Sequence, residues 1–303
     1  MSGEAATRPG TAKRPSVVRA WLLGARLKTL PVTLAPIAVG TAVAAGAGGP
    51  VQAWRTAPTL VFALGFVLGT NFLNDYSDGI RGADDHRVGP VRLVGSGQAS
   101  PGQVLRFGLV LYGVATAAGL VMAVTVSWWL LALAALCALG GWFYTGGSRP
   151  YGYHSLGDVS IFVFHGVIAV CATTYIQLER VPALAVGASV PIGLLACALL
   201  TTNNLRDIPT DTEAGKITIA VRLGARRTRI YYALLVAAAF AVALSLAPGR
   251  PAVLLVAAAA PVAVRPLRLV LGGARGGDLV PALEHTCWLL LAFGALLSTG
   301  LAL

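Results

Sequence analysis

Apolar runs of membrane-spanning length recur along this 303-residue chain, and they restrict its fold more than any other feature. A helix needs about 20 apolar residues to cross the hydrocarbon core of a bilayer. Backbone groups in lipid must be hydrogen-bonded internally, so each run is expected to be a helix. The sequence therefore predicts an all-α, polytopic membrane bundle of about nine transmembrane helices. The runs are residues 30–48, 57–74, 105–124, 127–145, 157–177, 182–202, 230–247, 251–270 and 286–303.

The charge content excludes a soluble protein of this size. Only 12% of the residues are charged and 56% are hydrophobic, whereas soluble domains carry roughly 25% charged residues. The abundant Gly and Ala of the runs fit closely packed membrane helices. The cysteines lie singly in apolar runs, so neither a disulfide framework nor a zinc site is expected. They are Cys137, Cys171, Cys197 and Cys287.

The basic residues predict how the bundle is oriented. With a cytoplasmic N-terminus, all but three of the 23 Lys and Arg residues fall on the cytoplasmic side, the exceptions being Arg55, Arg180 and Arg250. We expect a multi-pass protein of the cell (plasma) membrane, in contact with the lipid bilayer. The same bias accounts for the net charge of +11, so no nucleic-acid partner is expected. Residues 1–19 are expected to form a disordered basic arm, and residues 20–303 a single transmembrane domain.

Acidic residues gather in two segments on the predicted cytoplasmic side. Seven of the 12 acids lie there, which are Asp75, Asp78, Asp84, Asp85, Asp207, Asp211 and Glu213. Acids at the ends of membrane helices are costly, so a functional role is the first hypothesis. The alternative is that they are solvated loop charges paired with nearby arginines.

The two acidic segments resemble each other. In the first, Asn71, Asp75 and Asp78 share a helical face at spacings of four and three. In the second, Asn203, Asp207 and Asp211 share a face at spacing four. Each segment is followed by a Val-Arg-Leu triplet, at residues 91–93 and 221–223. The pattern predicts two pseudo-repeated halves whose acids face each other.

Opposed carboxylates suit a particular chemistry. Mg²⁺ binds through oxygen, taking one or two carboxylates together with substrate phosphates. Two acidic groups with Arg and Lys nearby therefore fit a diphosphate held through Mg²⁺, with the bases stabilising the charge of the leaving group. Apolar helix walls would hold a long isoprenoid tail.

Further short motifs occur between about residue 20 and residue 230. With the acidic segments, they are Lys28-Thr29-Leu30-Pro31, Asn74-Asp75-Tyr76-Ser77-Asp78 with Asp84, Gly89-Pro90-Val91-Arg92, Tyr144-Thr145-Gly146-Gly147, Pro150-Tyr151-Gly152-Tyr153, Asn203-Asn204-Leu205-Arg206-Asp207 and Gly215-Lys216-Ile217-Thr218. This ordered set resembles the motifs of the UbiA superfamily of membrane prenyltransferases, and in detail those of its MenA branch.

The resemblance implies nine helices around a central cavity and dependence on Mg²⁺. It also implies transfer of a polyprenyl group from polyprenyl diphosphate to 1,4-dihydroxy-2-naphthoate, releasing CO2 and diphosphate and giving demethylmenaquinone. Its catalytic aspartates would be Asp75, Asp78, Asp207 and Asp211. The metal ligands would be these four with Asn74 and Asp84. The diphosphate contacts would be Arg92, Lys216, Arg222 and, at a spacing that departs from the family, Arg149.

Three residues are candidates for binding the aromatic acceptor. Tyr144 would line the cavity, although anchoring at the membrane interface is an equal alternative. Asp158 stands where the family has Glu, and a helix-terminal carboxylate bonded to backbone N–H groups is the alternative. His165 stands where an aromatic residue is common, and an interhelical hydrogen-bonded histidine is the alternative.

Rival functions differ in where their acids lie. A UbiA-type enzyme acting on 4-hydroxybenzoate or homogentisate would carry the same acids. A phosphatidyltransferase of the CDP-alcohol type would group its acids in one continuous motif. A cation transporter would place them near mid-membrane, facing a pore. The sequence leaves the prenyl chain length and the oligomeric state open.

Overall fold

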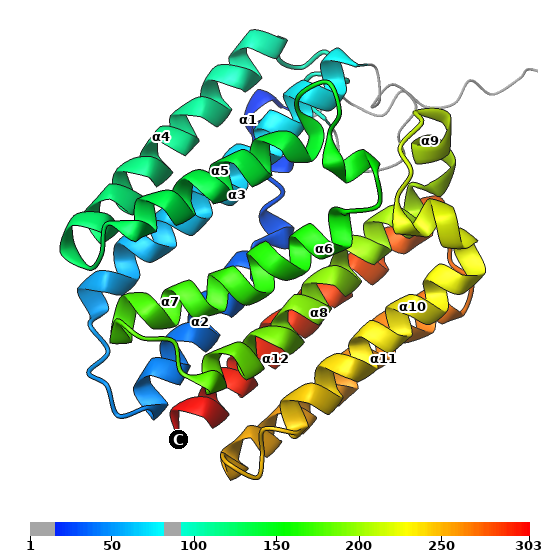
Figure 1. Ribbon diagram of the computed structural model, residues 1–303. Helices are drawn as coiled ribbons and strands as arrows, with labels where there is room; N and C mark the ends of the chain where they lie inside the picture. Colours follow the sequence, from blue (N-terminus) through cyan, green and yellow to red (C-terminus); the bar gives the residue numbers. More distant parts are fainter. Residues whose placement is uncertain (1–15, 82–91) are drawn as a thin grey trace, which may run out of the picture.

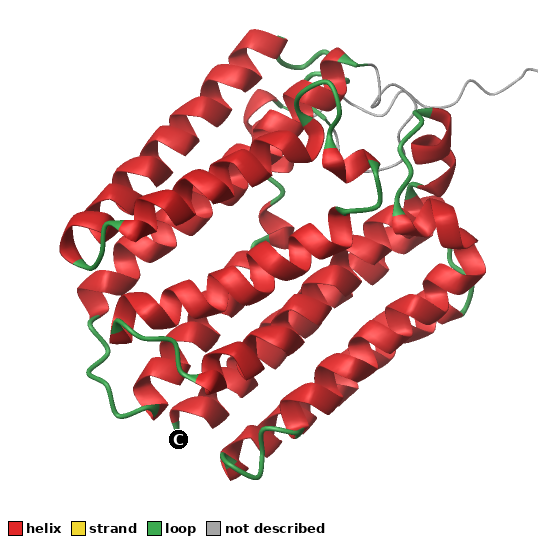
Figure 2. Ribbon diagram, in the orientation of Figure 1, coloured by secondary structure: helices red, strands yellow, loops and turns green. Residues whose placement is uncertain are grey.

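The computed structural model describes residues 16–81 and 92–303, and within these ranges the chain forms helices and no strand (Figures 1 and 2). Asp84 and residues 1–15 of the predicted basic arm lie outside the described ranges. In chain order the elements are α1 (Val17–Gly24), η1 (Leu27–Thr29), α2 (Pro31–Gly46), α3 (Ala53–Ile80), α4 (Pro101–Thr125), α5 (Trp129–Thr145), η2 (Tyr151–Tyr153), α6 (Gly157–Ile161), η3 (Phe162–Ile168), α7 (Ala169–Leu178), α8 (Ala183–Arg206), α9 (Ile208–Glu213), α10 (Ile219–Leu244), η4 (Pro251–Ala259), α11 (Ala260–Leu271), η5 (Gly276–Leu279) and α12 (Val280–Ala302).

The predicted all-α membrane bundle is confirmed, and each of the nine apolar runs lies in helix. Among the described residues, seven helices are long and apolar enough to cross a membrane. The N-terminal helices, Val17–Thr29 and Pro31–Gly46, are bent by 43° and count as an eighth span if taken together. Helix α5 has 17 residues, and at 1.5 Å per residue it extends about 26 Å, less than the roughly 30 Å of the hydrocarbon core. The count of nine therefore stays a prediction.

Helix α1 corrects the predicted boundary of the basic arm. The helix begins at Val17, inside the stretch 1–19 that was expected to be disordered. The Ser16 hydroxyl accepts a hydrogen bond from the Arg19 amide and caps the first turn. Ala20 is fully buried and packs with Phe72 of α3. An apolar face on residues 17–24 therefore holds the helix against the bundle.

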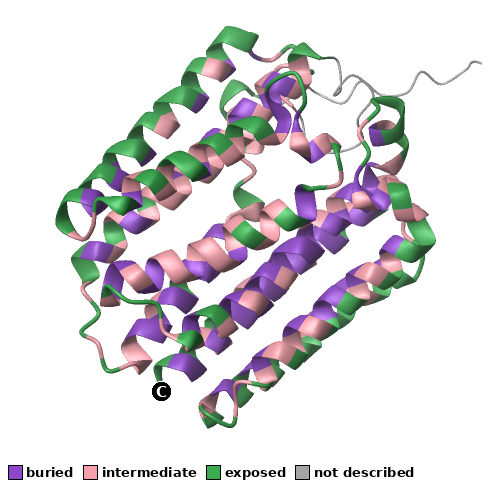
Figure 3. Ribbon diagram, in the orientation of Figure 1, coloured by how far each residue is buried: buried purple, intermediate pink, exposed green. Residues whose placement is uncertain are grey.

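Helix α8 lies at the centre of the molecule and is the most buried span (Figures 1 and 3). It packs against α10 on one side and against η3 on the other. The contact with η3 is close because both partners are glycines. A Cβ atom on Gly166 would lie 2.6 Å from the Cα atom of Gly193. Small residues allow membrane helices to approach in this way.

The first and last long helices pack side by side. Helices α2 and α12 share one of the largest helix–helix contacts of the fold, and Gly294 of α12 lies against Ala35 of α2. In Figure 1, α9 and the loop after α5 lie at one end of the bundle, and the C-terminus lies at the opposite end. The end that carries α9 also carries both acidic motifs.

Candidate active site

The first acidic motif occupies the last turns of α3. The Asp78 side chain accepts a hydrogen bond from the Tyr153 hydroxyl, with 3.4 Å between Oη and Oδ1. On its other oxygen it pairs with Arg92, whose Nη2 lies 3.7 Å from Oδ2. Asn74 is one turn earlier, and its Oδ1 accepts a hydrogen bond from the Thr145 hydroxyl at 2.6 Å. The Tyr144-Thr145-Gly146-Gly147 motif, at the end of α5, is therefore hydrogen-bonded to the first acidic motif.

The second acidic motif lies where α8 ends and α9 begins. Asp207 separates the two helices, and Pro209 lies in the first turn of α9, where a missing N–H is tolerated. Arg206 donates from Nε and Nη2 to the two carboxylate oxygens of Asp207, at 2.6 and 2.8 Å. Lys216 pairs with Asp211, with 3.2 Å between Nζ and Oδ1. Each carboxylate of this motif therefore has a basic partner.

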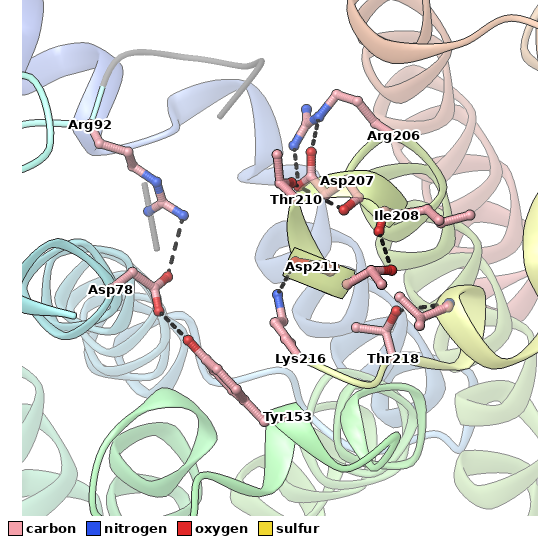
Figure 4. A network of polar contacts seen from close by, with 12 residues as sticks. Asp78, Arg92, Tyr153, Arg206, Asp207, Ile208, Thr210, Asp211, Lys216 and Thr218 are labelled. Atoms are coloured by element: carbon pink, nitrogen blue, oxygen red, sulfur yellow. Dashed lines mark hydrogen bonds and ion pairs between the residues drawn. The ribbon is translucent and has the colours of Figure 1, made fainter. Parts of the chain in front are cut away.

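Asp78 and Asp211 project from opposite sides toward the same region, as Figure 4 shows. Tyr153 connects them. Its hydroxyl binds Asp78, and the Nζ atom of Lys216 lies 5.9 Å from the centroid of its ring. The Tyr153 carbonyl accepts a hydrogen bond from the Ile217 amide at 3.0 Å. Burial and the neighbouring Asp78 raise the pKa of Tyr153 to about 12, so the phenol stays neutral at physiological pH.

Asp75 differs from the sequence expectation. Its side chain was expected beside the metal, but it is fully buried. One carboxylate oxygen accepts the Leu93 amide at 2.9 Å, and the other accepts the Val94 amide at 3.1 Å. The spacing that places Asp75 and Asp78 on one face does not reveal this, because the two amides come from a loop 18 and 19 residues away.

A cavity of about 750 Å³ opens between the two motifs and runs into the bundle. Arg92 lines it on one side and Arg206 on the other, with Asn74 and Asn203 from the ends of α3 and α8. Lys28 and Glu284 also line it, and they form an ion pair that links η1 to α12. The central cavity that the resemblance implies is thus present, with basic and amide groups at the motif end.

A second, smaller cavity of about 120 Å³ continues the first. Val32, Phe66, Val67, Cys137, Phe164 and His165 line both. Its walls are almost entirely apolar, and Met122, Leu130 and Ile176 pack together beside it as a buried cluster. Beyond this cluster, Arg55 pairs with Glu179 at 3.0 Å and joins the start of α3 to the end of α7.

The acceptor candidates separate into two groups. Tyr144 and His165 line the larger cavity, and Nδ1 of His165 is buried without a hydrogen-bond partner. Asp158 is buried elsewhere, and it accepts a hydrogen bond from the Tyr231 hydroxyl at 3.2 Å. It is not among the residues that line either cavity. Because Tyr231 lies on α10, Asp158 links α6 to α10, and its contact with the acceptor stays a prediction.

The basic candidates also differ in position. Arg92 lines the cavity, and Lys216 pairs with an acid of the second motif. Arg149 and Arg222 are exposed and line neither cavity. Arg206 and Glu284 line the larger cavity but were not predicted as site residues. Arg206 could have been predicted because it stands next to Asp207. Glu284 could not, because it is an isolated acid in the apolar last third of the sequence.

The oxygen donors fit a divalent metal held jointly with a phosphate. In the described part of the chain, no three His, Cys, Asp or Glu side chains converge closely enough to hold a metal alone. The carboxylates of Asp78, Asp207 and Asp211 each lie against a base, which marks them as places where positive charge is stabilised. Few protein ligands on each side leave room for phosphate oxygens, as Mg²⁺ requires.

The sequence profile of the UbiA prenyltransferase family matches residues 33–276. The chain belongs to the UbiA prenyltransferase family. A UbiA relative from Mycobacterium tuberculosis, named 1,4-dihydroxy-2-naphthoate octaprenyltransferase, is 45% identical over 281 residues, covering 91% of this chain and 96% of that protein. A relative of the same name from Escherichia coli is 37% identical, covering 74% of this chain and 75% of its own length.

Solved structures of UbiA homologues share the fold. The apo structure from Aeropyrum pernix K1 matches with a TM-score of 0.69 at 16% identity, over 88% of this chain and 96% of that one. The structure from Archaeoglobus fulgidus bound to GPP and Mg²⁺ matches with a TM-score of 0.63 at 15% identity, over 92% and 99%. The UbiA family and its membrane helices establish a multi-pass membrane protein.

Proposed function

We propose that this chain transfers a polyprenyl group from polyprenyl diphosphate to 1,4-dihydroxy-2-naphthoate, releasing CO2 and diphosphate and forming the hydroquinone demethylmenaquinol, which a separate two-electron oxidation would convert to demethylmenaquinone. The observation that carries the proposal is the paired arrangement of the two acidic motifs (Figure 4) beside a cavity that Asn74 and Arg206 of these motifs line. The names of the relatives at 36 to 46% identity support the naphthoate acceptor.

The acidic and basic residues of the two motifs have distinct roles in the proposed reaction. Asn74, Asp78, Asp207 and Asp211 would hold Mg²⁺, with Asp84 as a further ligand from outside the described residues. When bound, the metal supplies positive charge that holds the diphosphate and stabilises it as it leaves. Arg92 and Lys216 contribute further positive charge at the same end, while Arg149 and Arg222, on the exposed surface, would reach the diphosphate from outside.

The apolar cavities suit the prenyl tail. A polyprenyl chain has no polar groups, so burying it along apolar walls is favourable at about 25 cal/mol per Å². The larger cavity connects the motif end to the smaller one. We propose that the diphosphate lies beside Arg92 and Arg206 and that the tail runs inward past Phe66 and Phe164.

The acceptor needs an electron-rich ring next to the allylic carbon. Loss of diphosphate leaves a cation-like prenyl group, and the ring forms its new C–C bond at the carbon that bears the carboxylate. The C–C bond to that carboxylate then breaks, and its electron pair restores the aromatic ring. No side chain has to remove a ring proton. Tyr144 and His165 are the proposed acceptor contacts, since both line the cavity.

An acceptor panel tests the proposal. The purified full chain in detergent receives one polyprenyl diphosphate, Mg²⁺ and one acceptor, and products are identified by mass. We expect a decarboxylated, prenylated product from 1,4-dihydroxy-2-naphthoate. Faster product formation from 4-hydroxybenzoate or homogentisate would show that this compound, and not 1,4-dihydroxy-2-naphthoate, is the acceptor. The absence of a prenylated product from every acceptor would contradict prenyl transfer.

The membrane and orientation remain part of the proposal. We propose a plasma-membrane protein with a cytoplasmic N-terminus, because nearly all Lys and Arg residues then lie on the cytoplasmic side. Labelling of single cysteines introduced at residues 97 and 180, in a cysteine-free chain, tests this. A membrane-impermeant reagent added to intact cells should label position 180 and leave position 97 unlabelled.

A further inference from the structure

We propose that Asp75, although part of the first acidic motif, is a positioning residue that fixes Arg92 at the diphosphate site and does not bind the metal. The inference rests on the proposed function for the role of Arg92. It divides the motif into two parts: Asp78 faces the reactants, and Asp75 holds the loop that brings a base to them.

The contacts of Asp75 point away from a metal. Its side chain has no solvent exposure, and its two oxygens are each engaged by one backbone amide, from Leu93 and Val94. Hydrogen bonds from N–H groups to an ionised carboxylate are stronger than neutral ones. Neither Asp75 nor Asp78 lines a cavity, so the two aspartates differ in their partners, which are backbone amides for Asp75 but Arg92 and the Tyr153 hydroxyl for Asp78.

The loop held by Asp75 is compact and anchored. Leu93 is fully buried against Phe72 and Ala20. The Leu93 carbonyl accepts hydrogen bonds from the amides of Gln98 and Ala99, at 2.9 and 3.1 Å, which close the turn on itself. The loop also lies directly on α3.

Gly79 allows this close contact between the loop and α3. A Cβ atom at position 79 would lie 2.4 Å from Cγ1 of Val94. Asp75 and Gly79 are one helical turn apart. Asp75 binds the loop amides, and Gly79 leaves room for the Val94 side chain of the same loop. The loop therefore has one preferred position on the helix.

Arg92 is the residue immediately before the two anchored amides. Its side chain is only 10% exposed, and it reaches back to Asp78 at 3.7 Å. Fixing the backbone at Leu93 and Val94 restricts where the guanidinium can go. Replacing the Asp75 carboxylate with an amide would leave one acceptor oxygen for two N–H groups and set an NH2 group against one of them, so the loop would move to satisfy that N–H group.

A double-mutant cycle in the full-length chain tests the inference. The variants are Asp75→Asn, Arg92→Gln and the pair together, with Asp78→Asn as the matched change of a proposed metal ligand. Prenyl transfer is measured against donor concentration and against Mg²⁺ concentration. We expect Asp75→Asn to raise KM for the donor about tenfold and to shift the half-maximal Mg²⁺ concentration less than twofold. In the Arg92→Gln background, Asp75→Asn should change KM less than twofold.

Two kinetic results would overturn the inference. One is a Mg²⁺ requirement raised by Asp75→Asn as much as by Asp78→Asn, which would make Asp75 a ligand. The other is full additivity with Arg92→Gln, which would mean that Asp75 does not act through Arg92.

Amide hydrogen exchange provides a readout that does not need activity. Asp75→Asn should speed exchange of the amides in residues 93–99, and Asp78→Asn should leave them unchanged. Equal exchange rates of these amides in the unaltered chain and in the Asp75→Asn variant would contradict the positioning role of Asp75. Failure of the proposed function is a separate result, because it would appear as absent prenyl transfer in the unaltered chain while the exchange comparison still holds.

Discussion

Three carboxylates at the site each carry a basic partner, and the most buried pair joins neighbours in sequence. Arg206 and Asp207 are both nearly inaccessible, with side-chain exposures of 3% and 8%. A buried ion pair adds little net stability over apolar residues, but removing one partner is strongly destabilising because it strands a charge. The pair therefore holds Arg206, which lines the larger cavity, in a fixed position beside Asp207.

Asp207→Ala is expected to abolish prenyl transfer and to destabilise the chain by about 3–5 kcal/mol. Replacing Arg206 with Ala as well should restore much of the melting temperature without restoring turnover. Thermal unfolding in detergent and an activity assay at saturating Mg²⁺ measure both effects. Near-normal rates for Asp207→Ala would contradict the metal assignment, and a double variant less stable than Asp207→Ala would contradict the stranded charge.

The matching change in the first motif should behave differently. Asp78→Ala removes a partner of Arg92 and Tyr153 at longer distances, 3.7 and 3.4 Å. We expect turnover to be lost while the melting temperature stays within a few degrees. A folded Asp78→Ala variant that retains activity would show that the first motif does not contribute as proposed.

At the scale of elements, α5 forms one wall of both cavities. Ala134 lines the smaller cavity, and Leu136, two residues on, is exposed on the outer face of the same helix. Helical geometry places side chains two residues apart on different faces. The helix therefore offers a cavity position and a lipid-facing control within one turn.

Ala134→Phe is expected to shorten the space for the tail. The turnover of long polyprenyl diphosphates should fall tenfold or more in kcat/KM, while geranyl diphosphate should be used within about threefold of the unaltered rate. Leu136→Phe, the control, should change neither. Equal loss with short and long donors would show that the smaller cavity does not hold the distal tail.

The π-helical turn η3 is an element that the sequence did not predict. The run 157–177 was expected as a regular helix, but Phe162–Ile168 is wound more widely. Gly166 of this segment lies against Gly193 of α8, and π-turns often accompany functional sites. Phe164 and His165, in the same segment, line both cavities.

For the whole molecule, the proposed function requires a divalent cation. Removal with EDTA should abolish turnover reversibly, and Mg²⁺ should restore it. Asp78, Asp207 and Asp211 each already lie against a base, so the melting temperature without metal should change by only a few degrees. A large loss of stability in EDTA would indicate a structural metal, and unchanged turnover would exclude metal dependence.

The helical bundle and the two acidic motifs could be predicted from the sequence because both depend on local patterns. Apolar length predicts membrane helices, and the acids of each motif lie close together in the sequence. The helical face expected for Asp207 and Asp211 is interrupted, because Asp207 separates α8 from α9. The partners of Asp75 and Asp158 could not be predicted, because Leu93 and Tyr231 come from distant segments that meet only in three dimensions. The π-helical winding of η3 was not predicted either.

The contact between α2 and α12 has a consequence for biosynthesis. Val280 and Leu283, near the start of α12, form part of the wall of the larger cavity, so this wall is complete only when α12 has packed against α2. Substrate-binding competence should then arise after α12 has entered the bilayer. A polypeptide stalled before α12 emerges would be inserted in the membrane yet inert.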